Sequence, residues 1–231
     1  MLALENISVT WDDFTLTADL AVEAGETVAV IGPSGAGKST LLAAIAGFLP
    51  LVSGRITWDG RDLSPLSPGD RPISILFQDQ NLFPHLTIAE NIGLGLNPAL
   101  RLTAGDRARV EQALERTGLA GLGHRRPGQL SGGQQSRAAL ARVLLRARPL
   151  FLLDEPFSAL GPALKAEMLD LVAEIAAETG ATVLMVSHDP GDARRIAART
   201  ILVEGGRAHP PEPTGTLLDH PPESLRAYLG N

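Results

Sequence analysis

Residues 27–46 constrain the fold of this chain more than any other segment. Residues 27–31 form a short, continuous apolar run, which is typical of a strand buried on both faces of a parallel sheet. Gly32, Gly35 and Gly37 follow closely, and residues 38–46 are rich in helix-forming side chains. A buried strand that turns through glycines into a helix predicts an α/β fold.

The loop between that strand and that helix matches the pattern G-x-x-x-x-G-K-[ST] in full. Its sequence, continued by Thr40, is Gly32-Pro33-Ser34-Gly35-Ala36-Gly37-Lys38-Ser39. Glycines let the backbone turn its N–H groups inward, and with the helix N-terminus these make a nest for phosphate oxygens. Lys38 adds a positive charge at the outer phosphates, and Ser39 offers a hydroxyl to Mg²⁺. A chance glycine-rich turn is the alternative, but the flanking strand and helix argue against it.

The remaining segments predict a mixed domain with a helical insert. Before the middle of the chain, strand-like runs occur at residues 2–9, 14–22, 54–58 and 73–77. Helical spacing then appears at residues 87–96, 106–117 and 131–146. Strands and helices alternate afterwards, at residues 150–153, 162–179, 182–186, 189–198 and 201–203. This alternation predicts a mostly parallel, covered sheet, with a helical insert over roughly residues 84–129.

Composition excludes several classes of protein. The chain of 231 residues has a net charge of −6 and no cysteine, so it has no disulfide framework, and its acidic balance disfavours nucleic acid as a partner. The N-terminus has no basic start followed by an apolar run, so it does not have the pattern of a secretory signal. The longest apolar stretch, residues 41–52, is interrupted by Gly47 and Pro50, whereas a membrane-spanning helix needs about 20 apolar residues. We therefore expect a chain that does not cross a membrane by itself.

Two carboxylates end the apolar run at residues 150–153. Ligands bind at the carboxyl ends of parallel strands, which is where Asp154 and Glu155 would lie. Asp154 suits the ligand sphere of Mg²⁺, reached through water, and Glu155 suits the positioning or deprotonation of an attacking water. An acidic turn before Pro156 is the structural alternative, and the phosphate loop in the same chain makes it the weaker one.

The segment Leu130-Ser131-Gly132-Gly133-Gln134 lies between the loop and the acidic strand end, at the start of a predicted helix. Alone, such a segment is typical of a flexible loop that caps a helix. In this order with the other motifs it resembles the signature of the ABC ATPases, and the resemblance covers essentially the whole chain. The resemblance implies a P-loop NTPase-type, mostly parallel sheet with an antiparallel β subdomain and an inserted α-helical subdomain. It implies one domain, 1–231, with the core and β subdomain at 1–83 and 147–231 and the helical subdomain at 84–146.

The resemblance also assigns roles to single residues. It implies a head-to-tail dimer around two Mg-ATP, in which Ser131, Gly132, Gly133 and Gln134 of one copy cover the ATP held by Lys38 of the other. Gln78 matches a glutamine that touches Mg²⁺ and the attacking water, and His188 matches a histidine that contacts the γ-phosphate. Trp11 matches the aromatic residue that stacks on adenine. Phe14 is its competitor, although the alternating strand around it argues for a core position.

One position departs from the family pattern. Gly161 stands where the family usually has an aspartate that links the two nucleotide sites. The departure removes no phosphate or metal ligand, so we expect hydrolysis to remain, with the coupling between the sites in question.

Among ABC ATPases the chain favours a transporter subunit. It has no coiled-coil insert and only one ATPase unit, unlike the types that act on DNA or the ribosome. The run from Asn81 to Pro98 is similar to the ATPase subunit of bacterial thiamine importers, and importers of ferric iron, polyamines, sulfate or molybdate share much of it. Phe83, Pro84 and Leu86 are expected to form a groove for a permease helix, with loop packing as the alternative. The implied partners are a second copy, a membrane permease and, indirectly, a periplasmic solute-binding protein, with the chain peripheral on the cytoplasmic face of the inner membrane.

Overall fold

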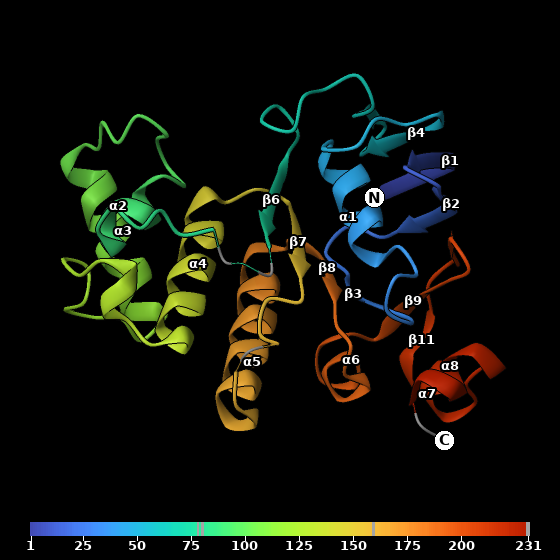
Figure 1. Cartoon of the computed structure of the whole chain (residues 1–231). Coiled ribbons are helices and arrows are strands. Elements are labelled where there is room, and N and C mark those ends of the chain that lie inside the picture. The colour runs from blue at the N-terminus through green and yellow to red at the C-terminus, as the bar shows by residue number, and fades with distance from the viewer. Residues whose placement is uncertain (78, 80, 159, 230–231) are drawn as a thin grey trace.

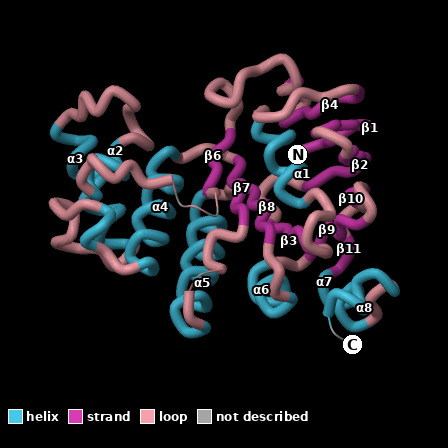
Figure 2. Tube along the Cα trace, in the orientation of Figure 1, coloured by secondary structure: helices cyan, strands magenta, loops and turns pink. Residues whose placement is uncertain are grey.

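The computed structural model describes residues 1–77, 79, 81–158 and 160–229, and within this part of the chain eleven strands form one mixed sheet (Figures 1 and 2). Their order is β5-β4-β1-β2-β10-β9-β3-β8-β7-β6, and β11 pairs with β9. The strands are β1 (Leu2–Trp11), β2 (Phe14–Val22), β3 (Thr27–Ile31), β4 (Ser53–Trp58), β5 (Arg61–Asp62), β6 (Ile73–Leu76), β7 (Leu150–Asp154), β8 (Thr182–Val186), β9 (Arg199–Glu204), β10 (Arg207–Ala208) and β11 (Glu212–Pro213).

The sheet has a parallel part and an antiparallel part. Strands β9, β3, β8, β7 and β6 run parallel, with Val28 opposite Leu184 and Leu152 opposite both Leu184 and Ile75. Strands β1, β2, β4 and β5 pair antiparallel. Because the carboxyl ends of parallel strands meet at one edge, the segments that follow β3, β7 and β8 are brought together there.

Helices cover both faces of the parallel strands. The helices are α1 (Lys38–Ala46), α2 (Ile88–Gly93), α3 (Ala104–Arg116), η1 (Pro127–Gln129), α4 (Gly132–Arg146), α5 (Pro162–Thr179), α6 (Pro190–Ile196), α7 (Thr214–Asp219) and α8 (Glu223–Leu229). On β3, Val28 and Val30 pack in the core cluster that holds α1, whereas Ala29 and Ile31 pack in the cluster that holds α5 and α6. Burial on both faces explains the continuous apolar run of this strand.

Helices α2, α3 and α4 share a third apolar cluster, and Figure 1 shows them grouped beside the sheet. Buried Ile88, Leu114 and Ala138 come from the three helices in turn. Each helix begins at a capping box, with Thr87, Thr103 and Ser131 as the N-cap residues. These caps satisfy backbone N–H groups that the first turn of a helix leaves unpaired.

The predicted elements differ from the observed ones mainly in short pieces. The predicted strand at 14–22 and the helices at 38–46 and 162–179 have the observed bounds, whereas the helix predicted at 87–96 ends at Gly93. Gly95 then packs so closely on α4 that a Cβ there would lie 2.5 Å from the Arg142 carbonyl oxygen. Strands β5, β10 and β11 and helix α7 were not predicted. Among the described residues no helix combines the length and the apolar character that crossing a bilayer requires.

Buried Arg71 fixes the end of α1, the helix that follows the phosphate loop. Its guanidinium donates to the carbonyl oxygens of Ala44 at 3.0 Å and Ile45 at 2.7 Å. The last carbonyls of a helix have no partner within the helix, so these bonds complete α1 without water. Burial lowers the pKa of Arg71, and the charge of Asp62 offsets part of that effect.

Candidate nucleotide-binding and catalytic site

The loop between β3 and α1 has a backbone that only glycine adopts easily. Gly32, Gly35 and Gly37 have φ angles of 152°, 76° and 105°. A Cβ on Gly32 would lie 1.9 Å from the carbonyl oxygen of Val203, and one on Gly37 would lie 2.9 Å from the Phe14 ring. The glycines therefore allow both the reversal of the chain and its close approach to β9 and β2. This is the cradle that the sequence predicts for phosphate.

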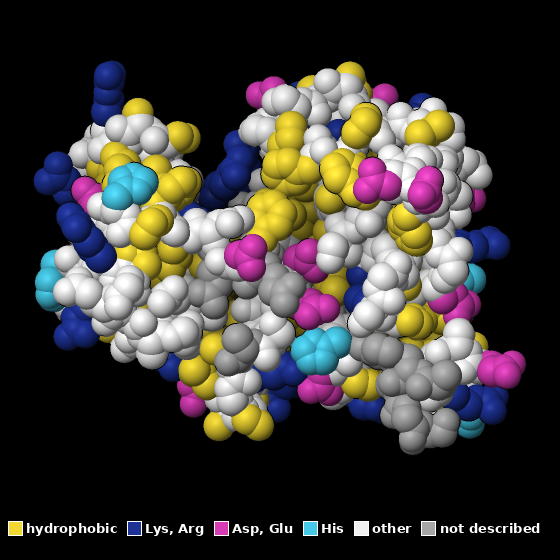
Figure 3. All heavy atoms as spheres, viewed as in Figure 1, with side chains coloured by type: hydrophobic (Ala, Val, Ile, Leu, Met, Phe, Trp, Pro, Cys, Tyr) yellow, Lys and Arg dark blue, Asp and Glu magenta, His cyan; other side chains and the backbone are white. Residues whose placement is uncertain are grey.

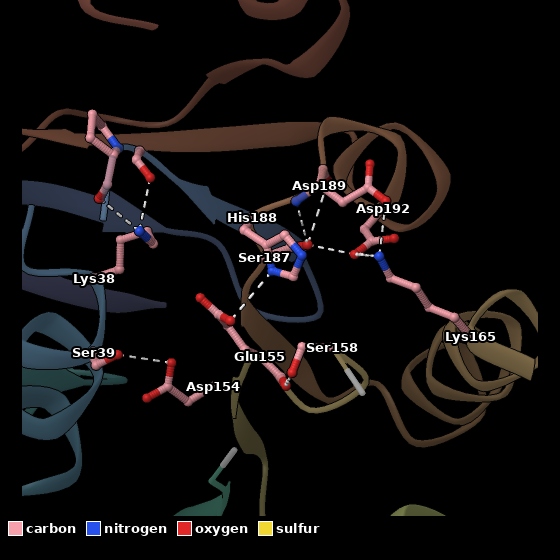
Figure 4. Close-up of polar contacts among 12 residues, drawn as sticks. Lys38, Ser39, Asp154, Glu155, Ser158, Lys165, Ser187, His188, Asp189 and Asp192 are labelled. Carbon is pink, nitrogen blue, oxygen red and sulfur yellow. Dashed lines mark hydrogen bonds and ion pairs between the residues drawn. The ribbon is translucent and has the colours of Figure 1, made fainter. Parts of the chain in front are cut away.

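Lys38 is folded against this loop. Its Nζ donates to the carbonyl oxygens of Gly32 at 2.8 Å and Pro33 at 2.9 Å, and its side chain is buried (Figure 4). Burial lowers the pKa of Lys38, and the charges of Glu155 and Asp154 offset part of that effect. Among the described residues the acceptors of this ammonium are two backbone carbonyls, so its charge is suited to bind an incoming anion.

Ser39 and Asp154 meet at the carboxyl edge of the sheet. The Ser39 Oγ donates to Asp154 Oδ1 at 3.1 Å, although the two residues lie 115 positions apart. Burial raises the pKa of Asp154, and the charge of Glu155 adds to this, whereas Ser39 and Lys38 oppose it. A hydroxyl and a carboxylate at this distance fit Mg²⁺, which takes few protein oxygens and completes its ligands with phosphates and water.

Glu155 has a left-handed backbone, with φ 44°, at the turn after β7. A non-glycine residue in this region stores strain, and such strain persists only where neighbouring bonds fix it. Here the Glu155 N–H donates to the Val186 carbonyl at 3.2 Å, and the Ser158 Oγ donates to the Glu155 carbonyl at 3.2 Å. Glu155 Oε2 lies 3.4 Å from Nδ1 of His188, so a carboxylate and an imidazole share this end of the site (Figure 4).

Trp11 and Phe14 occupy different environments at the hairpin between β1 and β2. The Trp11 side chain is 60% exposed. Phe14 lies opposite it in the hairpin and packs on the core behind Gly37. Trp11 is therefore the more exposed of the two aromatic side chains, and its stacking on adenine stays a prediction.

The signature segment lies apart from the phosphate loop of the same chain. In Figure 1, α4 and α1 stand on opposite sides of β6 and β7. Ser131 Oγ accepts from the Gln134 N–H at 3.3 Å, which leaves the hydroxyl proton for another acceptor. Gly133 packs on α5, because a Cβ there would lie 2.4 Å from the Leu164 side chain. Ser131 therefore caps α4, as the structural alternative predicts, and this cap is compatible with anion binding by the same segment.

Gln78, the predicted Mg²⁺ and water contact, lies outside the described residues.

Three charged residues beside the site were not assigned roles from the sequence. Lys165 on α5 forms ion pairs with Asp189 and Asp192, next to His188. The one available signal was Asp189 before Pro190, which is typical of a helix start and gives no indication of a lysine partner.

A phosphate cradle after β3, with carboxylates at the end of β7, which is separated from β3 by β8 alone, defines a P-loop nucleotide-hydrolysing protein. The family model described as ABC transporter matches residues 16–158. The chain belongs to the ABC transporter family, and the predicted family and ABC ATPase fold are confirmed.

Relatives and solved structures agree over nearly the full length. A Cereibacter sphaeroides protein named "Thiamine import ATP-binding protein ThiQ" is 71% identical, and a Ruegeria protein of the same name is 60% identical, each covering 100% of both chains. A dimeric post-hydrolysis structure of the ATP-binding cassette MJ0796, bound to ADP and Pi, superposes with a TM-score of 0.83. That structure is 31% identical and covers 93% of this chain and 99% of its own.

Proposed function

We propose that this chain is the ATP-hydrolysing subunit of an importer and that thiamine is the imported solute. The observation that carries the enzymatic part is the meeting of Lys38, Ser39, Asp154, Glu155 and His188 at one edge of the sheet. The solute is supported by relatives named as thiamine import proteins, which match the whole chain. An ATPase subunit need not contact the solute, so the assignment of thiamine rests on the relatives alone.

The residues divide the chemistry among them. Backbone N–H groups from Gly32 to Thr40 bind the phosphates, and the Lys38 ammonium moves from the loop carbonyls to the outer phosphate oxygens. Ser39 and Asp154, with Gln78, would hold Mg²⁺, which would supply charge neutralisation at the phosphates when bound. Glu155 orients the attacking water and takes its proton, and His188 contacts the γ-phosphate.

A second copy of the chain completes each site. Ser131 to Gln134 lie at the N-terminus of α4, away from Lys38 of the same chain, so they reach a phosphate only across an interface. A hydroxyl proton, glycine N–H groups and a helix N-terminus suit an anion there. The MJ0796 cassette was solved as a dimer with ADP and Pi, which supports this arrangement.

A membrane permease is the partner that hydrolysis would drive. Phe83 is 47% exposed. Figure 3 shows apolar side chains gathered in patches on the face of the molecule that it displays. Buried Asn91 fixes the loop, because it accepts from the Phe83 N–H at 2.7 Å and donates to the carbonyls of Phe83 and Leu86. A loop held in this way can present Phe83, Pro84 and Leu86 to a permease helix.

The remaining organisation follows from these partners. We place the core and β subdomain at 1–83 and 147–231 and the helical subdomain at 84–146, which contains the cluster of α2, α3 and α4. The protein lies on the cytoplasmic face of the inner membrane, held by its permease, and a periplasmic solute-binding protein acts through that permease.

The Glu155→Gln variant tests the enzymatic proposal. It should bind ATP and lose hydrolysis by about 100-fold or more, because general-base help is worth about 10²- to 10⁴-fold. With ATP it should elute as a dimer in gel filtration, while the wild type without nucleotide provides the reference. Undiminished turnover in this variant would contradict the assignment of Glu155.

Uptake into vesicles tests the solute. The chain and the permease encoded beside it, reconstituted with the binding protein, should import labelled thiamine when ATP is inside, and the Glu155→Gln assembly should not. Active hydrolysis without thiamine uptake would show that another solute is carried.

A further inference from the structure

A half-buried lysine, Lys165, connects α5 to the loop that carries His188. The Nζ of Lys165 lies 2.9 Å from Asp189 Oδ2 and 2.8 Å from Asp192 Oδ2 (Figure 4). Asp192 Oδ2 also accepts a short hydrogen bond, 2.5 Å, from the Ser187 hydroxyl. Asp189 and Asp192 belong to the start of α6, so the ammonium joins one helix to the beginning of another.

The burial of Lys165 and Asp192 makes their ion pair a weak source of stability, because both charges lose most of their contact with water. The side chains of Lys165 and Asp192 are only 15% and 9% exposed. Burial lowers the pKa of Lys165, but its hydrogen bonds and charge interactions with Asp192 and Asp189 outweigh this and leave the pKa raised. A buried ion pair often adds little net stability compared with apolar packing, whereas it defines one geometry.

That geometry is the path of the chain on both sides of His188. Before it, the Ser187 N–H donates to the Val30 carbonyl at 3.2 Å. After it, the Asp189 N–H donates to Ser187 Oγ at 3.1 Å, and Asp189 Oδ1 accepts from the Gly191 N–H at 2.8 Å. His188 therefore lies between two anchored residues, and its ring lies 3.4 Å from Glu155. The Ser187–Val30 bond joins backbone groups, whereas the Ser187 hydroxyl bonds Asp192, and Asp192 and Asp189 are the two carboxylates that pair with Lys165.

We propose that Lys165 is a positioning residue, which holds the Ser187–Asp192 segment so that His188 stays against Glu155 and the phosphate site. The proposal rests on the proposed function, because it adds a residue to the same hydrolytic site. Lys165 lies in the first turn of α5, and its backbone N–H donates to the carbonyl of Gly161, the N-cap residue, at 2.9 Å. Through Lys165, the start of α5 and the His188 segment keep one relative position.

The chain contains a matched control for a role in simple attachment of α5 to α6. Arg195 on α6 forms two hydrogen bonds to the Asp170 carboxylate on α5, at 2.8 Å and 2.6 Å, on the surface. Asp170→Asn removes an ion pair between the same two helices without touching residues 187–192. If Lys165 only fastened the helices together, the two changes would act alike.

The first arm follows the imidazole of His188 and needs no nucleotide. The chain has five histidines, so the ring signals can be resolved by NMR and the His188 signal identified by its loss in His188→Ala. Lys165→Met should shift or broaden this signal, Lys165→Arg should largely restore it, and Asp170→Asn should leave it unchanged. An unchanged signal in Lys165→Met would overturn the proposal.

The second arm measures hydrolysis. Lys165→Met should lower kcat by about 10- to 100-fold with little change in the KM for ATP, because misplacement of a catalytic group by about 1 Å can cost about 100-fold. Lys165→Arg should recover most of kcat, and Asp170→Asn should keep it. In the His188→Ala background, Lys165→Met should cause no further loss, since coupled residues are not additive. A full further loss there would overturn the proposal.

A milder variant guards against a failure to fold. Asp189→Asn keeps the cap on α6 and removes one charge from the cluster, so it should give a smaller shift and a smaller loss of kcat in the same direction. A shifted His188 signal with unchanged kcat would refute the part of the proposal that concerns hydrolysis. Absence of hydrolysis in the wild type would instead contradict the proposed function, while the NMR arm would still decide whether Lys165 positions the loop.

Discussion

At the residue scale, the ionised form of Asp154 is destabilised by its partial burial at the phosphate site. The carboxyl group is partly buried at the end of β7, where burial raises its pKa and the Ser39 hydrogen bond offsets part of the effect. Ionised groups are disfavoured in such places unless they are paired. Stability of the free protein therefore favours the protonated carboxyl, whereas Mg²⁺ binds the ionised carboxylate.

Asp154→Asn should therefore stabilise the protein in the absence of nucleotide, while abolishing its response to Mg²⁺. A carboxyl whose pKa is raised by folding loses stability as pH rises from the unfolded value, about 3.9, through the folded value. The difference between the variant and the wild type should grow over this interval and persist at pH 7 and above. Thermal unfolding between pH 4 and pH 8 measures it, and a variant less stable than the wild type at pH 7.5 would contradict the argument.

Lys38→Ala should weaken ATP binding by about 10- to 100-fold. Hydrogen bonds to a charged group contribute about 1.5–3 kcal/mol, and about 1.4 kcal/mol corresponds to a factor of ten. Titration calorimetry with ATP and Mg²⁺ measures the change. The matched control is Lys165→Met, because Lys38 and Lys165 are the only lysines of the chain and only Lys38 lies in the loop. Equal affinities in Lys38→Ala and the wild type would refute the assignment of the loop.

At the scale of elements, helix α5 starts without a side-chain cap. Gly161 is the N-cap residue, with extended φ and ψ angles of −65° and 156°, and Pro162 follows. A Cβ on Gly161 would meet no atom within 4 Å. Helices α2, α3 and α4, in contrast, all begin at capping boxes. The position therefore has room for a side chain that glycine does not supply.

Gly161→Asp should raise the free energy of unfolding by a few tenths of a kcal/mol, because aspartate caps a helix slightly better than glycine. Gly161→Asn, which caps as well but carries no charge, is the control, and thermal unfolding compares the two. We expect the wild type to hydrolyse ATP already. Faster turnover with Asp but not with Asn would show that a charge between the nucleotide sites is what the natural chain lacks. Equal turnover in all three proteins would show that the departure at Gly161 has no effect on hydrolysis.

At the scale of the molecule, the sheet separates two half-sites. The phosphate loop, Asp154, Glu155 and His188 gather at the carboxyl edge of the parallel strands, whereas Ser131 starts α4 beyond β6 and β7 (Figure 1). No rotation of a side chain can bridge two secondary-structure elements separated in this way. We propose that a second chain supplies the other half-site, in which case hydrolysis depends on dimer formation.

Ser131→Arg in the Glu155→Gln background should prevent the dimer that ATP otherwise forms, while binding of ATP to the single chain persists. A long cation at the N-terminus of α4 occupies the space for phosphate and opposes the helix dipole. Ser131→Ala is the control, because it removes the cap, at a cost of about 1 kcal/mol, without the bulk. Gel filtration with ATP separates the outcomes, and a dimer of undiminished stability in Ser131→Arg would contradict the head-to-tail arrangement.

The sequence by itself determined the elements with strong local patterns. The apolar run at 27–31, the glycine loop and the helix at 162–179 were predicted with their observed bounds, because periodicity and glycine content act over a few residues. The order of the motifs sufficed for the family. The two-residue strands β5, β10 and β11 have no such pattern, since they exist only through pairing with β4, β2 and β9.

Only the tertiary structure decided which distant groups meet. Ser39 bonds Asp154 across 115 positions, Arg71 completes α1, and Lys165 joins the carboxylates beside His188. Such contacts depend on how helices pack against the sheet, and no spacing in the chain records them. Local pattern therefore determined the long strands and helices, whereas the burial of apolar faces on both sides of β3 and β7 determined which charges came to lie together.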